Sequence, residues 1–237
     1  DICMLLGKRI SMLYRKICRR YTGTGKTALF FGCNFPSFYP ETTRYLGKLL
    51  AEKADAFSVF DCCGKPIAEL GLEEKETVIL ERLNKKLLEA GVREVVMVCP
   101  NCYAFLKDKL SVPVISIYEK LQELGLGNRI MEEQNIFLPC PDREKRELLK
   151  QIRPFLTAEP KILSSANCCG LGGCAALKEP ELAAQMAKSA GSIQNTSVYC
   201  ASCAGNLTRA GGKNIKHLLV QILGREEVPD AERVAGK

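Results

Sequence analysis

Tryptophan is absent from this 237-residue chain, aromatic residues make up only 7% of it, and histidine occurs once, as His217. The sequence therefore predicts a core of aliphatic side chains, and mixed cysteine–histidine metal sites have almost no histidine to draw on. No apolar run reaches the roughly eighteen residues expected of a membrane-spanning helix, and the start lacks the pattern of a secretory signal peptide. We expect a soluble, cytoplasmic protein in a reducing compartment, where thiols more often bind metals or serve redox chemistry than form disulfides.

Most of the chain also lacks an excess of either charge. The formal charge is +7, but residues 1–26 carry seven basic side chains against Asp1 alone, so the remainder is nearly neutral. A neutral body without a basic, aromatic-interleaved face argues against nucleic-acid binding. Residues 1–27 form a basic N-terminal arm, with helical spacing over residues 1–20. This arm could dock on an acidic partner subunit, contact a membrane surface, or present a solvated basic helix face.

Cysteine, in contrast, is abundant, with 13 copies. Ten of them fall into two sets of the same order: a lone cysteine, an adjacent pair followed by glycine, and a Cys-x2-Cys loop. The first set is Cys33, Cys62, Cys63, Cys99 and Cys102, and the second set is Cys140, Cys168, Cys169, Cys200 and Cys203. This shared order indicates that the chain contains an internal duplication.

Short apolar runs alternate with longer amphipathic segments in both halves. We predict strands over residues 28–31, 56–60, 92–98, 112–117, 135–138, 161–163 and 196–199. We predict helices over residues 42–54, 74–90, 101–110, 143–155 and 181–190. This alternation is typical of α/β units with parallel sheets. We therefore expect two tandem, pseudo-twofold-related α/β repeats, over 28–130 and 131–224, and a frayed C-terminal tail over 225–237.

The cysteine groups of each set follow predicted strands. Ligands of parallel α/β sheets gather at the carboxyl ends of the strands, so the five thiols of each set should converge at one edge. Glycines flank the cysteines, where a bulky group would need close backbone approach. These glycines are Gly32, Gly64, Gly170, Gly172 and Gly173. The pattern predicts one metal-binding centre per half.

Two kinds of metal centre compete for such thiols. A structural zinc ion takes four ligands, whereas each set offers five, two of them contiguous. Contiguous side chains point in different directions and suit a multi-iron cluster better than a single ion. Iron–sulfur binding is therefore favoured, although the spacing differs from that of a ferredoxin, and a zinc-stapled interaction module without redox activity remains the alternative.

The ten cysteines, in this order and approximate spacing over residues 28–224, resemble the duplicated cysteine-rich "CCG" domain of heterodisulfide reductase catalytic subunits. Iron–sulfur subunits of glycolate oxidase, lactate-utilisation enzymes and anaerobic glycerol-3-phosphate dehydrogenase are relatives. The resemblance implies that each set holds a non-cubane [4Fe-4S] cluster, with a disulfide substrate cleaved between the two. The chain would then be an oxidoreductase subunit of anaerobic metabolism that reduces a small-molecule disulfide or oxidises thiols.

The resemblance also implies a redox partner. The chain has no ferredoxin-type cysteine quartet, so electrons would come from a ferredoxin-like or flavin-containing partner subunit, or from a further upstream domain. Any flavin would belong to the partner. The alternative within the same family is an electron-transfer subunit of a flavin-dependent 2-hydroxyacid or glycerol-3-phosphate dehydrogenase.

Several conspicuous residues fall outside the two sets. Cys3 and Cys18 are interpreted as ordinary apolar or surface cysteines, and Cys174 as a packing thiol rather than a spare ligand. The segment over residues 21–27 is not a phosphate-binding loop, because Arg20 stands where the first glycine is needed. His217, aligned with Tyr118 in the repeat, is expected to start a helix or to donate a hydrogen bond near a cluster.

Overall fold

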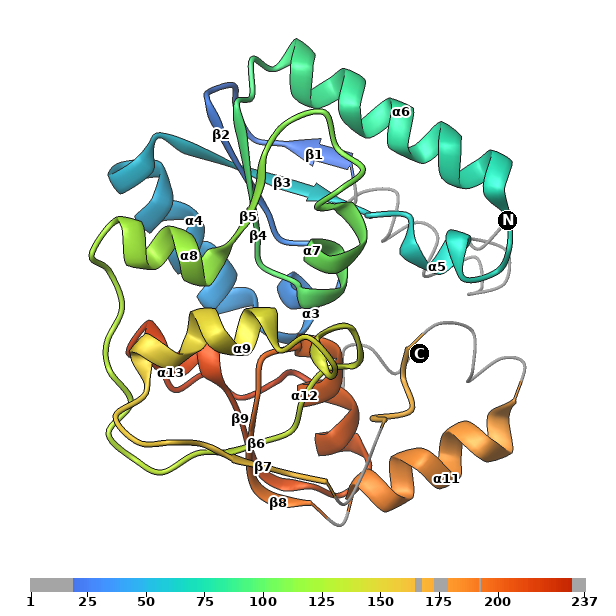
Figure 1. Ribbon diagram of the computed structural model, residues 1–237, viewed down its shortest axis with the longest axis vertical. Coiled ribbons are helices and arrows are strands. Elements are labelled where there is room, and N and C mark those ends of the chain that lie inside the picture. Colours follow the sequence, from blue (N-terminus) through green and yellow to red (C-terminus); the bar gives the residue numbers. More distant parts are fainter. Residues whose placement is uncertain (1–18, 165–167, 173–178, 192, 232–237) are drawn as a thin grey trace.

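The computed structural model describes residues 19–164, 168–172, 179–191 and 193–231. It consists of two α/β halves, one above the other in Figure 1. The strands of the first half are β1 (Arg19–Tyr21), β2 (Thr27–Phe30), β3 (Ala56–Asp61), β4 (Glu94–Met97) and β5 (Val114–Ser116). The strands of the second half are β6 (Asn135–Ile136), β7 (Lys161–Ile162), β8 (Gln194–Val198) and β9 (Lys213–His217).

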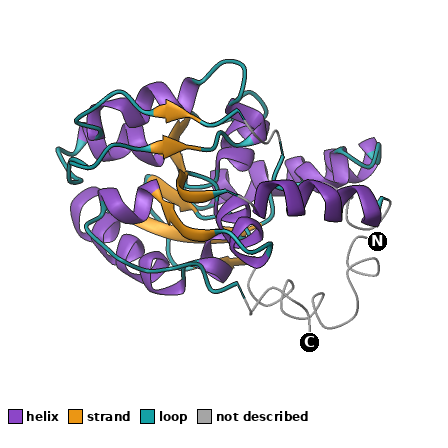
Figure 2. Cartoon of the chain, turned by 90° about the horizontal axis from the view of Figure 1, so that it is seen from below, coloured by secondary structure: helices purple, strands orange, loops and turns teal. Residues whose placement is uncertain are grey.

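Helices flank the strands of both halves (Figure 2). In the first half they are α3 (Phe35–Phe38), α4 (Pro40–Ala54), α5 (Lys65–Ala68), α6 (Glu73–Glu89), α7 (Pro100–Leu106) and α8 (Ile117–Glu123). In the second half they are α9 (Glu147–Ile152), α11 (Pro180–Gly191), α12 (Ala201–Arg209) and α13 (Leu218–Ile222), with 3-10 turns η1 (Cys140–Asp142) and η2 (Arg153–Phe155). None of the helices within the described ranges combines the length and apolarity needed to cross a membrane.

The two sheets have the same strand order. Four parallel strands of the first half are ordered β3-β2-β4-β5, and the four parallel strands of the second are ordered β7-β6-β8-β9. In each sheet the strand that precedes the lone cysteine, β2 or β6, is a central strand. On one side of it lies the strand that precedes the cysteine pair, β3 or β7, and on the other side lies the strand that precedes the Cys-x2-Cys loop, β4 or β8. The prediction of two similar α/β units with short parallel sheets is thus confirmed.

Two edge strands were not predicted. β1 pairs antiparallel with β3. Its first two residues, Arg19 and Arg20, belong to the basic segment over residues 1–20 for which helical spacing was predicted, so no strand was expected there. That prediction is wrong at residues 19 and 20, and its remainder lies outside the described residues. β9 is polar, with only Ile215 and His217 buried, as suits an edge strand with one covered face.

The helix predicted over residues 143–155 is shorter than expected. Arg146 has a left-handed backbone (φ 50°), and the helix α9 begins only at Glu147. The buried Asp142 carboxylate accepts hydrogen bonds from the N–H groups of Leu148 and Leu149, at 3.0 and 2.9 Å, and so caps this later start. Pro154 lies in η2, where a proline cannot continue an α-helix.

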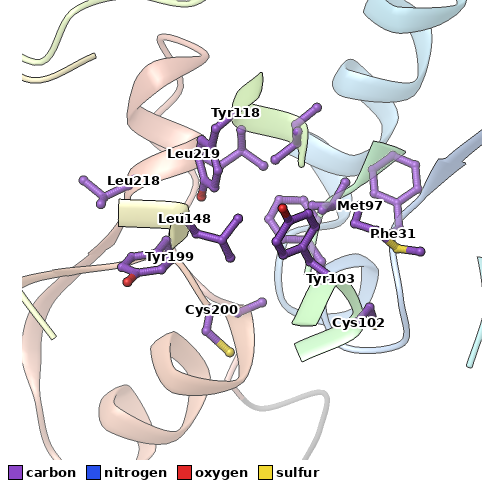
Figure 3. Packing of buried hydrophobic residues seen from close by; sticks show 14 of the residues in the cluster. Phe31, Met97, Cys102, Tyr103, Tyr118, Leu148, Tyr199, Cys200, Leu218 and Leu219 are labelled. Carbon is purple, nitrogen blue, oxygen red and sulfur yellow. The ribbon is translucent and has the colours of Figure 1, made fainter. Parts of the chain in front are cut away.

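A single buried cluster extends through both halves. It includes Phe31, Met97 and Tyr103 from the first half and Tyr199 and Leu219 from the second (Figure 3). The expected aliphatic core is confirmed, because most of the buried hydrophobic side chains among the described residues are Leu, Ile, Val or Ala. The largest of the fully buried side chains are nevertheless Phe or Tyr. The few aromatic residues are therefore concentrated in the interior rather than spread over the surface.

The described part of the tail, residues 225–231, contacts the first half. The Glu227 carboxylate accepts hydrogen bonds from the N–H groups of Glu41 and Thr42, at 2.9 and 2.6 Å, at the start of α4. Arg225 lies over the ring of Tyr45. The expected fraying is wrong for residues 225–231, because a carboxylate at a helix start is favoured by the helix dipole. Residues 232–237 lie outside the described part.

Candidate metal centre

Five of the six cysteine groups lie within four residues of the carboxyl end of a parallel strand, and the second pair, Cys168 and Cys169, follows β7 at a longer interval. Cys33, Cys62 and Cys99 follow β2, β3 and β4, and Cys140 and Cys200 follow β6 and β8 in the same way. Asp61, the last residue of β3, fixes the first cysteine pair: its buried carboxylate accepts from the Cys62 N–H at 2.7 Å and is paired with Arg82 at 2.8 Å. None of the ten cysteines of the two sets, all of which lie within the described residues, forms a disulfide.

In the first set, four thiols are joined by hydrogen bonds. Cys63 contacts both Cys62 and Cys102, and Cys102 also contacts Cys99. Cys33 lies near these thiols, because its neighbour Gly32 is in close contact with Cys102: a Cβ at Gly32 would lie only 3.0 Å from the Cys102 sulfur. The three cysteine groups of this half therefore converge at the sheet edge.

In the second set, hydrogen bonds join all five thiols in one series. The order is Cys140, Cys168, Cys169, Cys203 and Cys200. Cys140 is exposed, whereas Cys169, Cys200 and Cys203 are buried. The thiols thus run from the surface into the interior.

Backbone N–H groups turn toward the thiols in both halves. The Gly64 N–H donates to the Cys62 sulfur at 3.4 Å, and the Gly170 N–H donates to the Cys168 sulfur at 3.3 Å. Both glycines have positive φ, 86° and 80°, a conformation that other residues rarely adopt. The glycine after each cysteine pair is therefore needed to aim a donor at sulfur, as expected around metal-bound thiolates.

One further observation fits a bound group that accepts hydrogen bonds. The Tyr118 hydroxyl is buried without a hydrogen-bond partner, and Tyr118 interacts electrostatically with both Cys99 and Cys200. Burial raises the pKa of Tyr118, so its O–H remains a donor. A buried unpartnered donor between two cysteine sets fits an acceptor such as a sulfide-containing cluster.

The thiols differ in how readily they ionise. The pKa of Cys63 is lowered well below its ordinary value by hydrogen bonds from Cys102 and Cys62, and that of Cys168 is lowered chiefly by a hydrogen bond from Cys140. The pKa values of Cys102 and Cys140 are raised, because each gives its proton to that hydrogen bond. Each adjacent pair thus contains one thiol biased toward the thiolate, the form that binds metals.

Polar side chains connect the two sets. Asn101, inside the first Cys-x2-Cys loop, donates to the Cys200 sulfur at 3.6 Å. Asn34, next to Cys33, donates to the Ser202 hydroxyl at 2.6 Å. Neither contact was predicted from the sequence, although Asn101 and Ser202 stand between predicted ligands.

The structure also tests what was predicted for the residues outside the two sets, of which His217 is described. His217 caps the start of α13 by accepting from the Leu219 N–H at 3.2 Å, so the expected helix start is confirmed. The strand register pairs Met97 with Ser116 and Val198 with His217. His217 is therefore equivalent to Ser116 rather than to Tyr118. Cys3, Cys18, Cys174 and Gly173 lie outside the described residues.

Among the described residues, no group of three or more His, Cys, Asp or Glu side chains has the arrangement required to hold one metal ion. Several cysteine thiolates with backbone donors nearby are the kind of surroundings that iron–sulfur clusters have. The assignment of the ten cysteines as ligands stays a prediction.

The comparisons with known proteins agree with the duplication. A family model for a cysteine-rich domain (CCG) matches the chain twice, over residues 27–107 and 134–208. Each matched stretch contains one complete set of five cysteines. A protein of Methanocaldococcus jannaschii, described as an uncharacterized iron-sulfur protein, is 31% identical over 140 residues, which are 54% of this chain and 28% of that protein. The chain thus matches less than a third of that relative's length, and no solved structure matches the chain significantly.

Proposed function

The chain belongs to the CCG cysteine-rich domain family, with two copies of the domain, and on that premise we propose that it is an iron–sulfur oxidoreductase subunit that reduces a disulfide or oxidises thiols. In this proposal each five-cysteine set holds a [4Fe-4S] cluster of the non-cubane kind. The observation that carries the proposal is the convergence of thiols in both halves, with the Gly64 and Gly170 N–H groups aimed at sulfur. The relative described as an iron-sulfur protein supports iron over zinc.

A bound iron–sulfur cluster supplies one-electron transfer. The protein's own contribution is to hold the thiolates, exclude water from them and keep the two sets facing each other. Cys63, Cys102, Cys169, Cys200 and Cys203 are each at most 5% exposed. Burial on this scale strengthens the electrostatic influence of every nearby donor.

The exposed end of the second set offers a place for the disulfide. Cys140 is exposed, and the positive charge of Arg143 acts on both Cys140 and Cys168. It adds to the hydrogen bond from Cys140 that lowers the pKa of Cys168, and it opposes the hydrogen bond and the burial that raise the pKa of Cys140. Reduction of a disulfide consumes two electrons and two protons and yields two thiols. A cation beside these sulfurs favours the developing thiolate.

The electrons would come from a redox partner subunit, either ferredoxin-like or a flavoprotein, and any flavin would belong to that partner. The basic arm over residues 1–27 is proposed to contact an acidic partner or a membrane surface, and no nucleic acid is involved. The proposed location is the cytoplasm.

Anaerobic purification followed by iron, zinc and acid-labile sulfide analysis tests the proposal. We expect about eight irons per chain and matching sulfide, falling to about half when either Cys62 or Cys168 is replaced by serine. Cys18→Ser, outside both sets, is the control and should leave the iron content unchanged. Zinc without sulfide would overturn the proposal in favour of an interaction module.

Turnover separates the two iron–sulfur roles. With an artificial electron donor, the loaded protein should reduce small disulfides, and oxidation in the presence of thiol should give a thiol-dependent paramagnetic signal. A loaded protein that transfers electrons only from a flavoprotein dehydrogenase, without disulfide turnover, would instead be an electron-transfer subunit.

A further inference from the structure

The two cysteine sets are joined by three polar side chains, which we call the inter-set bridge: Asn34, Asn101 and Ser202. The Asn101 amide nitrogen lies 3.6 Å from the Cys200 sulfur, and the Asn34 amide nitrogen lies 2.6 Å from the Ser202 hydroxyl. The Ser202 hydroxyl is itself hydrogen-bonded to Cys200. Both contacts cross from the first half to the second.

Asn101 and Ser202 occupy the same place in the two repeats. Each is the residue just before the last cysteine of its Cys-x2-Cys loop, and the two loops follow the equivalent strands β4 and β8. Ser202 contacts a cysteine of its own loop, whereas Asn101 contacts a cysteine of the other half. The bridge is therefore asymmetric, and both side chains converge on Cys200.

Cys200 is well placed to respond to these donors. Cys200 is only 1% exposed, and its sulfur also interacts with the backbone N–H groups of Ser202 and Cys203. A donor aimed at a cluster sulfur stabilises negative charge, and the reduced cluster carries one more negative charge than the oxidised one. Hydrogen bonds to sulfur accordingly raise the reduction potential, and more so in a buried, low-dielectric site.

We propose that Asn101 is a positioning residue that, through its hydrogen bond to the Cys200 sulfur, raises the reduction potential of the second cluster above that of the first. An electron that enters the chain then comes to rest in the second half, next to the exposed Cys140. This inference rests on the proposed function, since it requires that both sets hold clusters.

The test is an anaerobic redox titration followed by paramagnetic resonance. Signals are assigned to the two sets with Cys62→Ser and Cys168→Ser, which each abolish one of them. Asn101→Leu removes the donor, and Asn101→Asp keeps the size but replaces the donor by a carboxylate. Asn84→Leu is the matched control: Asn84 lies on α6, where it contacts Lys109 and Ser111 at 3.3 and 2.7 Å, away from both sets.

In the wild type, the second-set signal should have the higher midpoint. Asn101→Leu should lower it by about 59 mV, which corresponds to a tenfold change in the ratio of oxidised to reduced cluster, and Asn101→Asp should lower it further. Asn84→Leu should leave both midpoints unchanged. Iron and sulfide content should stay at the wild-type level in the Asn101 variants.

The proposal is overturned if the second-set midpoint does not move in either Asn101 variant, if only the first-set midpoint moves, or if Asn84→Leu shifts it equally. If Asn101→Leu loses iron, the midpoint of the second-set signal in Asn101→Asp is judged by the same three outcomes. If both variants lose iron, Asn101 has a structural role and the proposal that it adjusts the reduction potential is overturned. A wild-type protein without iron and sulfide would instead contradict the proposed function itself.

Discussion

Replacing Gly170 by alanine should empty the second cysteine set while the first set keeps its iron. Gly170 follows the second cysteine pair and has φ +80°, and a Cβ there would lie 2.7 Å from the Ala183 carbonyl oxygen and 3.2 Å from the Ala187 nitrogen. Both atoms belong to the backbone of α11, so no side-chain rotation relieves the collision. The Gly170 N–H, which donates to the Cys168 sulfur at 3.3 Å, must move with the chain.

The magnitude follows from two contributions. A left-handed backbone costs an L-residue about 1–2 kcal/mol, and overpacking of a well-filled site costs about 1–3 kcal/mol. We therefore expect Gly170→Ala to destabilise the folded protein by about 2–5 kcal/mol. Gly64→Ala should have a smaller effect, because the nearest neighbours of its Cβ would be side-chain atoms of Ile79, at 3.0 Å or more, rather than backbone atoms at 2.7 Å.

The assay is iron and sulfide analysis under anaerobic conditions together with unfolding in denaturant. Gly172→Ala is the control, since a Cβ at Gly172 would have no neighbour within 4 Å in the part of the chain that the structure describes. Iron should fall to about half in Gly170→Ala and stay near the wild-type level in Gly172→Ala. The reasoning is refuted if Gly170→Ala and Gly172→Ala bind the same iron and unfold at the same denaturant concentration.

Three other substitutions probe the surroundings of the site. Gly205→Ala should destabilise the fold by about 3 kcal/mol or more, because its Cβ would lie 1.9 Å from the Phe38 ring; Phe38→Leu in the same chain should restore part of the unfolding free energy. Burial lowers the pKa of His217 to about 3, so below its ordinary pKa of about 6.5 only the unfolded chain takes up this proton. The free energy of unfolding should therefore fall by about 1.4 kcal/mol for each unit by which the pH drops below 6.5. His217→Asn should remove this part of the pH dependence between pH 6.5 and 4.5, as measured by denaturant titrations. Glu227→Gln should cost about 1 kcal/mol and speed proteolysis of the tail, and unchanged cleavage would contradict the capping role at α4.

Periodicity and strand signals predicted most of the fold because the buried strands have a strong pattern. β2 is buried at every position, as a central parallel strand should be, and its range was predicted within one residue. The polar edge strands β1 and β9 lack such a pattern and were missed. The break at Arg146 depends on the distant Tyr199, whose hydroxyl donates to Asp142 at 2.7 Å, and tertiary contacts of this kind are invisible to local periodicity.

The composition predicted the largely aliphatic core correctly. It did not show where the few aromatic residues would lie, because that depends on contacts between the two halves. Phe35 and Tyr39 pack edge-on against His217, with ring centroids 5.4 and 5.1 Å apart. Because these contacts join the first half to the second, aromatic residues are used where the two repeats must be held together.

The order of the cysteines predicted which thiols would meet, but it treated the two sets as equivalent. The structure shows which contacts the two sets share and which differ between them. The glycine after each cysteine pair has the same role in both halves, since each N–H donates to the first sulfur of its pair. The residue before the last cysteine does not, because Asn101 contacts the opposite set and Ser202 its own. The glycine that aims a donor at sulfur is retained in both repeats, whereas the side chains between the sets differ, and such side chains would make two bound clusters unequal.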